Sequence, residues 1–243
     1  MVSGSDMHGT PITVTAQQEG KTPEQVAMEY HKLNSDSIER MGISFDLFSH
    51  THTEEHAEVA LSILKKLDDN GYIEPRISEE PYDPIANQFL PDRYVEGTCP
   101  HCNYDSARGD QCDDCGKTLD SKELINPRSK LNPDAKIEFR ETEHLFFKLS
   151  EFRDVLLEWL SEGKGHWRPS VINFTRNWLK EGLIDRAVTR DLDWGIEIPR
   201  EGYENKRMYV WFEAVMGYYS ASVHWAKNQG KPDEWKKWWE NED

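Results

Sequence analysis

The sequence predicts an α/β fold with a mostly parallel sheet that is interrupted by one inserted module. Segments with helical periodicity alternate with short, strand-like apolar segments towards both ends of the chain, which is the pattern of βαβ units. Between them, residues 74–98 are rich in proline, aspartate and glutamate, and residues 117–136 are again irregular. We therefore predict three units, at residues 1–74, 75–140 and 141–243.

The first unit begins abruptly. Thr10 is a suitable N-cap and Pro11 a suitable first residue for a helix that ends at Gly20. The chain therefore starts at a turn that leads from a strand into a helix, and we expect the strand itself to be missing. On this interpretation the first unit is truncated at its start.

Further signals in the first unit predict two more helices and a strand. Thr22 and Gln25 have the spacing of a capping box and open a second helix. Residues 43–48 alternate between apolar and polar side chains, as in a strand, and a third helix runs from Thr53 to a cap at Gly71. These elements supply the alternation on which the α/β assignment rests.

The third unit repeats this alternation. A strand-like segment precedes a helix capped by Ser150, and a later strand end leads into a long helix predicted over residues 212–227. The tail, residues 232–243, carries three tryptophans with no obvious partner. We expect their packing partners to lie beyond the end of the chain, and this unit to be truncated before its end.

Charge and composition disfavour several classes of protein. The chain has 29 Lys and Arg against 45 Asp and Glu, a net charge of -16, and such a surface repels the phosphates of nucleic acids. No segment approaches the length of a membrane span, and the first residues do not form a signal peptide. We expect a cytoplasmic protein with no membrane partner.

All four cysteines lie in two closely spaced pairs, Cys99-Pro-His-Cys102 and Cys112-Asp-Asp-Cys115. A disulfide is disfavoured because nothing indicates secretion, and a thioredoxin-like redox site needs one such pair on a βαβ unit. Two pairs at this spacing favour a tetrahedral zinc site, which would be structural because no ligand position is left for water. Gly97 and Gly116 are expected to let backbone amides point at the sulfur atoms. The low apolar content nearby suggests that the metal and turns hold this module together.

Two turns between a strand and a helix are candidate ligand sites, because ligands of open α/β sheets bind at the carboxyl ends of strands. At one turn, Asp6 could accept a hydrogen bond from an ammonium group. At the other, Trp211, Ala214 and Tyr218 have i, i+3, i+7 spacing and could form a wall for a thioether or aliphatic side chain. Spacing alone favours a simpler interpretation, since such a stripe usually belongs to the core and a turn aspartate is usually a cap.

Four stretches, in the same order, resemble methionyl-tRNA synthetase, and the resemblance covers essentially the whole chain. They are Ser3-Gly-Ser-Asp-Met-His-Gly-Thr-Pro-Ile12, Phe89-Leu-Pro-Asp-Arg-Tyr-Val-Glu-Gly-Thr-Cys-Pro100, Glu123-Leu-Ile-Asn-Pro-Arg128 and Tyr209-Val-Trp-Phe-Glu-Ala-Val-Met-Gly-Tyr218. This family consists of class I aminoacyl-tRNA synthetases with a Rossmann-type catalytic domain and a zinc-bearing connective insertion. The resemblance implies an incomplete Rossmann-type parallel sheet with a zinc-ribbon subdomain inserted at residues 75–140.

The resemblance also implies roles for individual residues. Asp6 would bind the α-amino group of methionine. Trp211, Ala214 and Tyr218 would line the pocket for the methionine side chain. Arg190 would be the catalytic residue and would lie near the adenylate.

In the insertion, the resemblance implies that the four cysteines are the zinc ligands. Some family members carry a second zinc knuckle just before the Phe-Leu-Pro-Asp-Arg motif, but residues 82–86 contain no cysteine here, so we expect one zinc ion. His8 is expected to have only a structural role in its turn. Glu213 stands where the family more usually has aspartate.

By this resemblance, the whole enzyme is a methionine–tRNA ligase that activates methionine with ATP and Mg²⁺ and transfers it to tRNA(Met). The class I motifs His-Ile-Gly-His and Lys-Met-Ser-Lys-Ser do not occur in this sequence, nor do the anticodon-binding domain and the downstream pocket histidine. Adenylate formation depends on positive charge placed around the phosphates, so we expect this chain to be inactive without the missing N- and C-terminal parts. The alternative is a non-catalytic zinc-ribbon interaction protein derived from a synthetase.

Overall fold

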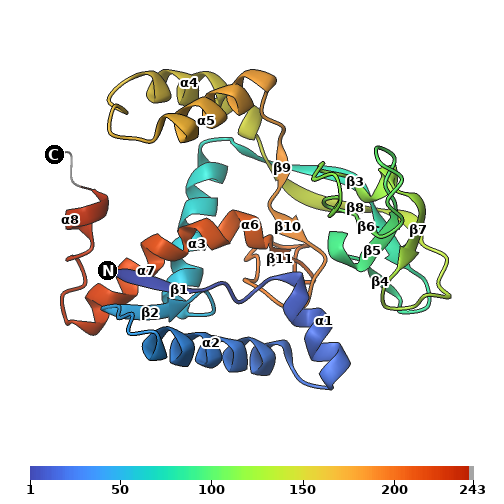
Figure 1. Cartoon of the computed structure of the whole chain (residues 1–243), viewed down its shortest axis with the longest axis horizontal. Coiled ribbons are helices and arrows are strands. Elements are labelled where there is room, and N and C mark those ends of the chain that lie inside the picture. The colour runs from blue at the N-terminus through green and yellow to red at the C-terminus, as the bar shows by residue number, and fades with distance from the viewer. Residues whose placement is uncertain (241–243) are drawn as a thin grey trace.

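The computed structural model describes residues 1–240, apart from the side chain of Asp92. The predicted tail at residues 232–243 therefore extends beyond the described part of the chain. That part contains eight α-helices and four small β-sheets (Figure 1). The helices are α1 (Thr10–Glu19), α2 (Pro23–Arg40), α3 (Glu54–Asp69), α4 (Arg153–Ser161), α5 (Pro169–Glu181), α6 (Val210–Glu213), α7 (Gly217–Asn228) and α8 (Lys236–Trp239). None of the eight has the length and apolar character of a membrane span.

A short parallel sheet confirms the predicted α/β class. β1 (Val2–Ser5) pairs with β2 (Leu47–His50) along its whole length. The two strands approach so closely at Gly4 that a Cβ atom there would lie 2.6 Å from the carbonyl oxygen of Ser49, which explains the glycine. α7 packs against both strands, and α3 packs against α7. The parallel part of the described chain is limited to these two strands, and the other ladders are antiparallel.

Three predictions for this region are wrong. The strand before the first helix is present as β1, which is hard to recognise because Val2 is its only branched apolar residue. The next strand begins at Leu47 and not at residue 43, because its pairing partner extends no further than Val2. The N-cap of α1 is Gly9, so that Thr10 is already the first helical residue. The predicted capping box of α2 is confirmed, with both of its hydrogen bonds present.

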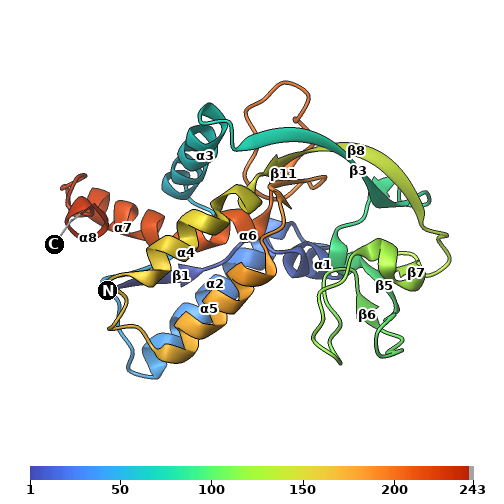
Figure 2. The same cartoon turned by 90° about the horizontal axis from the view of Figure 1, so that it is seen from above.

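A long antiparallel ribbon occupies much of the segment predicted to be irregular at residues 74–98. β3 (Ile73–Asp83) pairs with β8 (Glu138–Phe147), and β4 (Gln88–Phe89) and β9 (Arg186–Ala187) pair with their outer edges. The ribbon arches from the helices to the insertion (Figure 2). Local composition does not reveal it, because proline and glutamate are poor strand formers and the pairing partner lies far along the chain.

The insertion has a sheet and an apolar cluster of its own. β5 (Val95–Thr98) lies between β6 (Ala107–Arg108) and β7 (Ile125–Ser129), and β7 falls within the segment predicted to be irregular at residues 117–136. The buried cluster consists of Leu90, Tyr94, Val95, Cys99, Ala107, Cys112, Leu119 and Leu124. Packing and strand pairing therefore hold the insertion together in addition to its cysteines and turns, which corrects the expectation drawn from its low apolar content.

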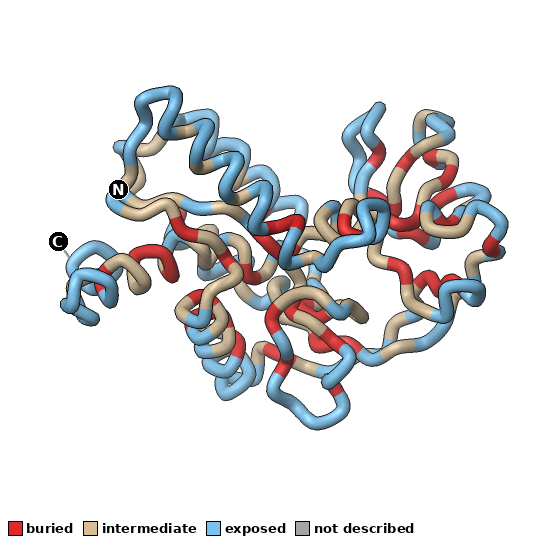
Figure 3. The backbone as a smooth tube through the Cα atoms, turned by 90° about the horizontal axis from the view of Figure 1, so that it is seen from below, coloured by how far each residue is buried: buried red, intermediate tan, exposed pale blue. Residues whose placement is uncertain are grey.

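The main core lies where α3, the ribbon and the chain around β10 (Thr189–Arg190) and β11 (Arg207–Met208) meet. It is made of Ala60, Leu64, Ile73, Leu145, Val188, Ile196, Ile198, Tyr203 and Met208. Figure 3 shows buried residues gathered at the centre of the molecule and again in the insertion, whereas the outer faces of the helices are exposed. The fold thus has two packed centres joined by the ribbon.

Two predicted helices differ in the third unit. The helix expected after Ser150 is preceded by a 3₁₀ turn and begins at Arg153. The long helix predicted over residues 212–227 is divided by another 3₁₀ turn, Ala214–Met216, so that α7 begins at Gly217. This second turn lies inside the predicted aromatic wall.

The tryptophans of the tail have partners on α7 within the chain, although Trp238 and Trp239 remain 61% and 46% exposed. Trp235 and Trp239 contact the ring of Tyr219 edge-on, with centroids 4.9 and 5.2 Å apart. Trp238 contacts Trp225 in the same way. The tail pairs with a helix that precedes it in the chain, and local sequence does not show such folding back.

Candidate functional site

Two neighbouring cavities lie at the carboxyl end of the parallel sheet. Their volumes are about 270 and 300 Å³, at the lower end of the range of small-molecule sites. Asp6 and Trp211 line both cavities. The cavities therefore share one wall and lie where open α/β folds bind their ligands.

The smaller cavity brings together four of the predicted site residues. Asp6, Trp211, Ala214 and Tyr218 all line it. Asp6 follows directly after β1, whereas the other three come from α6, the 3₁₀ turn and α7. Trp211 and Tyr218 are each 64% exposed, which argues against the interpretation of this stripe as core.

The ends of β1 and β2 form the opposite wall of the smaller cavity, and His50 stands out there. The Nδ1 atom of His50 is buried and has no hydrogen-bond partner within the described part of the chain. Burial, reinforced by the neighbouring imidazoles, lowers the pKa of His50 to about 4, so the ring is neutral at pH 7. His50 Nδ1 is thus an unsatisfied polar atom of a residue that lines the smaller cavity.

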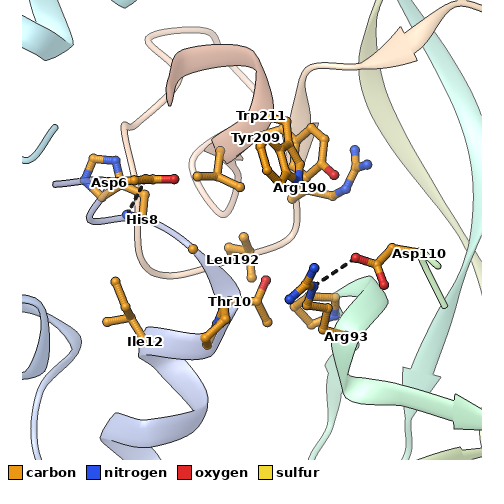
Figure 4. A pocket seen from close by; sticks show the side chains of 14 residues that line it. Asp6, His8, Thr10, Ile12, Arg93, Asp110, Arg190, Leu192, Tyr209 and Trp211 are labelled. Atoms are coloured by element: carbon orange, nitrogen blue, oxygen red, sulfur yellow. Dashed lines mark hydrogen bonds and ion pairs between the residues drawn. The ribbon is translucent and has the colours of Figure 1, made fainter. Parts of the chain in front are cut away.

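The larger cavity lies between the insertion and the end of the parallel sheet (Figure 4). On the insertion side, Arg93 donates from Nε to Asp110 Oδ2 at 2.9 Å. Thr10, Arg190 and Tyr209 line the same cavity from the other elements. Sequence analysis assigned no role to Arg93, although its Phe-Leu-Pro-Asp-Arg motif was the available signal.

Arg190, on β10, lies in the larger cavity and is held firmly. Its guanidinium lies over the ring of Tyr209, 4.0 Å from the centroid. Its Nη1 atom donates to the carbonyl oxygens of Ala187 and Thr189 at 3.3 and 2.9 Å. A permanent positive charge is therefore fixed close to the wall that the two cavities share.

Asp6 has an unusual charge environment. Burial, followed by the negative charge of Glu213, raises the pKa of Asp6 above its ordinary value, although the N–H of His8 donates to its carboxylate at 3.4 Å. Part of the side chain remains exposed, so a ligand can reach it. An ammonium group placed here would offset both unfavourable effects.

Glu213 lies directly behind these cavities and is completely buried. Its Oε1 accepts a hydrogen bond from His8 Nδ1 at 2.9 Å, and its Oε2 accepts one from His56 Nε2 at 2.5 Å. Burial opposes ionisation, but these hydrogen bonds outweigh it and hold the pKa of Glu213 below its ordinary value. The sequence did not identify His56 as a site residue, and it showed Glu213 only as a glutamate in place of the family's more usual aspartate. A single acidic residue within an apolar run was the usable signal.

The four cysteines form a second candidate site, in the insertion. Their sulfur atoms all lie within 4.8 Å of one another. Cys99 and Cys115 are 3.9 Å apart at Sγ, and Cys102 and Cys112 are 3.6 Å apart. Zinc–sulfur bonds of about 2.3 Å imply S···S separations of roughly 3.8 Å in a tetrahedron, so this cluster could hold a metal ion.

The backbone around Cys99 favours its thiolate form. The N–H of His101 donates to Cys99 Sγ at 3.4 Å, and backbone hydrogen bonds lower the pKa of Cys99 to about 7 despite its burial. Burial and the neighbouring sulfur atoms instead raise the pKa of Cys102 to about 12. Gly116 has a φ of +71°, as expected for a glycine that lets the chain turn back. At Gly97 a side chain is excluded for a different reason. A Cβ atom there would lie 3.0 Å from the carbonyl oxygen of Ile125 on the neighbouring strand.

Comparisons with known proteins identify the family of this chain. The family model described as tRNA synthetases class I (M) matches residues 1–243. A methionine–tRNA ligase of Dehalococcoides mccartyi is 57% identical over 239 residues, which cover 98% of this chain and 43% of the relative. The corresponding ligase of Thermomicrobium roseum is 54% identical, with 98% of this chain and 41% of the relative covered. This chain therefore spans less than half the length of these relatives.

The fold also has a counterpart among solved structures. A structure of Mycobacterium tuberculosis methionyl-tRNA synthetase in complex with methionyl-adenylate aligns with a TM-score of 0.65 and covers 98% of this chain and 41% of that one. The sequence identity in this alignment is 20%. At that level the likeness establishes the fold alone, and the fold agrees with the predicted incomplete Rossmann-type class.

Proposed function

Because this chain belongs to the class I methionyl-tRNA synthetases, we propose that it supplies the methionine pocket and the zinc-binding insertion of a methionine–tRNA ligase. The complete enzyme would activate methionine with ATP and Mg²⁺ and transfer it to tRNA(Met) in cytoplasmic translation. The remaining parts of the synthetase would be this chain's partners. We also propose that residues 1–74 and 141–243 are the two parts of a catalytic domain and that residues 75–140 are its connective insertion.

The convergence of four side chains on the smaller cavity carries this proposal. Asp6 would accept hydrogen bonds from the α-ammonium group of methionine. The rings of Trp211 and Tyr218 would contact the thioether, since sulfur packs well against aromatic edges. Ala214 would leave room between them for the side chain. These roles match the charge, exposure and arrangement of the four residues.

Arg190 would act next to this pocket. Its guanidinium lines the adjoining cavity and is held against Tyr209. A fixed positive charge stabilises negative charge that develops during acyl transfer. Arg190 would therefore lie near the adenylate and act there, while the pocket residues hold the amino acid.

The insertion would hold one structural Zn²⁺ ion. The ligands would be Cys99, Cys102, Cys112 and Cys115, whose sulfur spacing and backbone surroundings fit a thiolate site. A four-cysteine site leaves no position for water or substrate, so the ion would stabilise the insertion and take no part in the chemistry.

Isothermal titration calorimetry with L-methionine tests the proposed pocket. The chain should bind methionine, and Asp6→Asn should weaken binding about 10–100-fold, because a hydrogen bond to a charged group contributes about 1.5–3 kcal/mol. Asp193→Asn, at an exposed position nearby in the fold's third unit, is the matched control and should bind like the parent chain. Absence of binding, or equal binding by the Asp6 variant, would contradict the proposal.

A further inference from the structure

The carboxylate of Glu213 is buried, and burial makes an ionised group energetically unfavourable. Its side chain is 0% exposed, and a carboxylate without partners would not remain ionised there. Both oxygens are nevertheless satisfied, and by histidines from two different elements. His8 lies in the turn after β1, and His56 lies on α3. Neither the proposed pocket nor Arg190 uses this group.

The hydrogen bonds continue beyond both histidines. His8 Nε2 lies 3.1 Å from His52 Nδ1, and His56 Nδ1 lies 2.8 Å from Ser220 Oγ. Each ring thus has a partner at both nitrogens, and one nitrogen of each ring donates to the Glu213 carboxylate, which can only accept. Both oxygens of Glu213 and both ring nitrogens of His8 and His56 therefore have a partner within this network.

The position of this network relates it to the pocket. His8 is two residues after Asp6, and Glu213 lies between Trp211 and Ala214 in sequence. We propose that Glu213 is a positioning residue, which uses His8 and His56 to lock the Asp6 turn against the Trp211–Ala214 segment and so fixes the two walls of the pocket before a ligand binds. This inference rests on the proposed function, because it concerns the geometry of the proposed methionine pocket.

The charge of Glu213 has a second effect on the same pocket. The titratable groups around it are His8, His56 and Asp6, with His52 behind His8. After burial, the negative charge of Glu213 is the main cause of the raised pKa of Asp6. Methionine binding should weaken at acid pH, where Asp6 becomes protonated. Removing the charge of Glu213 should lower the pKa of Asp6 and so move this acid limb of the binding profile to lower pH. A purely structural role of Glu213 would leave the acid limb where it is.

Amide hydrogen exchange, followed by NMR, tests the lock without a ligand. Glu213→Gln removes the charge and replaces one acceptor oxygen by an NH₂ group, so one histidine must change tautomer and the charge-assisted hydrogen bonds that hold the lock weaken. Exchange should then accelerate about tenfold or more at Met7, whose N–H donates to Thr51 Oγ1, and at the amides of residues 214–217. The β3–β8 ribbon should keep its protection. Glu58→Gln, at an exposed position on the helix that carries His56, is the matched control and should change neither segment.

A second variant covers the case in which Glu213→Gln does not fold. His56→Leu removes one partner of Glu213 from α3, outside both walls of the pocket, and should accelerate exchange in the same two segments. If either folded variant exchanges like the parent chain at both segments, or loosens the whole molecule uniformly, the inference is wrong.

Methionine titrations of the same variants separate this inference from the proposed function. Glu213→Gln should weaken methionine binding about tenfold at pH 7 and shift the acid limb of the pH profile to lower pH. A parent chain that does not bind methionine would overturn the proposed function, whereas the exchange data would still decide whether Glu213 locks the two walls. If the acid limb of the pH profile does not shift in Glu213→Gln, the charge of Glu213 does not control the pKa of Asp6.

Discussion

Asp83 and Glu213 show how buried acidic residues organise this molecule. Both side chains are fully buried, and hydrogen bonds hold the pKa of each below its ordinary value against the effect of burial. A carboxyl group in this state stabilises the fold only while it is ionised. The two residues lie in the two packed centres, Asp83 at the base of the insertion and Glu213 behind the pocket.

Asp83 is the clearest case for a stability measurement. Its Oδ1 accepts from the N–H groups of Ile85 and Ala86, and its Oδ2 accepts from Ser129 Oγ and Asn132 Nδ2. The carboxylate thus joins the turn after β3 to the loop after β7.

Asp83→Ala should destabilise the chain by about 2–4 kcal/mol in urea denaturation at pH 7, because four donors lose their acceptor. Asp134→Ala, at an exposed position in the same loop region, should change stability by less than about 0.5 kcal/mol. The folded pKa is lowered, so this stabilisation is present above the ordinary value of 3.8 and is lost as the pH falls through the lower folded value. A loss that stays constant down to acid unfolding would contradict this account.

Among the helices and strands, locally determined features could be predicted and remote pairings could not. The capping box of Thr22 and Gln25 and the left-handed Gly116 depend on residues within a few positions, and both are present. β3 depends on β8, which follows only after the whole insertion, and its own composition argues against a strand. Sequence reasoning succeeds here where the cause lies nearby in the chain.

The candidate site follows the same rule. Trp211, Ala214 and Tyr218 lie on one short segment, so their common orientation could be anticipated from spacing. Glu213 could not be assigned a role, because its partner His56 is 157 residues away in the sequence and only the fold brings them together. Asp6 was a candidate both from its turn and from the family resemblance, but neither gave a reason for the buried charge of Glu213 behind it.

The insertion allows a test at the scale of a single element. Purified chain should contain one zinc ion by elemental analysis, and Cys112→Ser should abolish it. Loss of the metal should disorder β5, β6 and β7, because structural zinc sites contribute about 10–16 kcal/mol of binding free energy that is coupled to folding. The amide NMR signals of β1 and β2 should remain, since these strands belong to the other packed centre.

His101→Ala is the control for this test, because His101 lies between the first two cysteines and is exposed. It should keep its zinc and its insertion signals. Two zinc ions per chain, none at all, or an insertion that stays ordered without metal would contradict the proposed site.

The whole molecule has two packed centres and two cavities, and the two cavities share one wall. Asp6 and Trp211 line both cavities, the insertion presents Arg93 and Asp110 to the larger one, and the β3–β8 ribbon connects the two centres. This arrangement places the proposed methionine pocket next to a fixed arginine. The His-Ile-Gly-His and Lys-Met-Ser-Lys-Ser motifs, which would surround ATP phosphates, do not occur in the sequence.

We therefore expect no methionine-dependent ATP–pyrophosphate exchange by this chain alone. Binding of methionine without the positive charges that stabilise the leaving group does not lower the barrier to adenylate formation. The full-length Dehalococcoides mccartyi ligase, 57% identical over the shared region, is the positive control. Robust exchange by the isolated chain would show that the two motifs are dispensable.

The location of bound methionine tests the central claim most directly. With [methyl-13C]methionine bound to the chain, intermolecular nuclear Overhauser effects should connect the ligand methyl group to the rings of Trp211 and Tyr218, the two aromatic walls of the smaller cavity. Effects only to Pro91 and Leu192, which line the larger cavity, would contradict the account, as would a bound ligand with no contact to either ring.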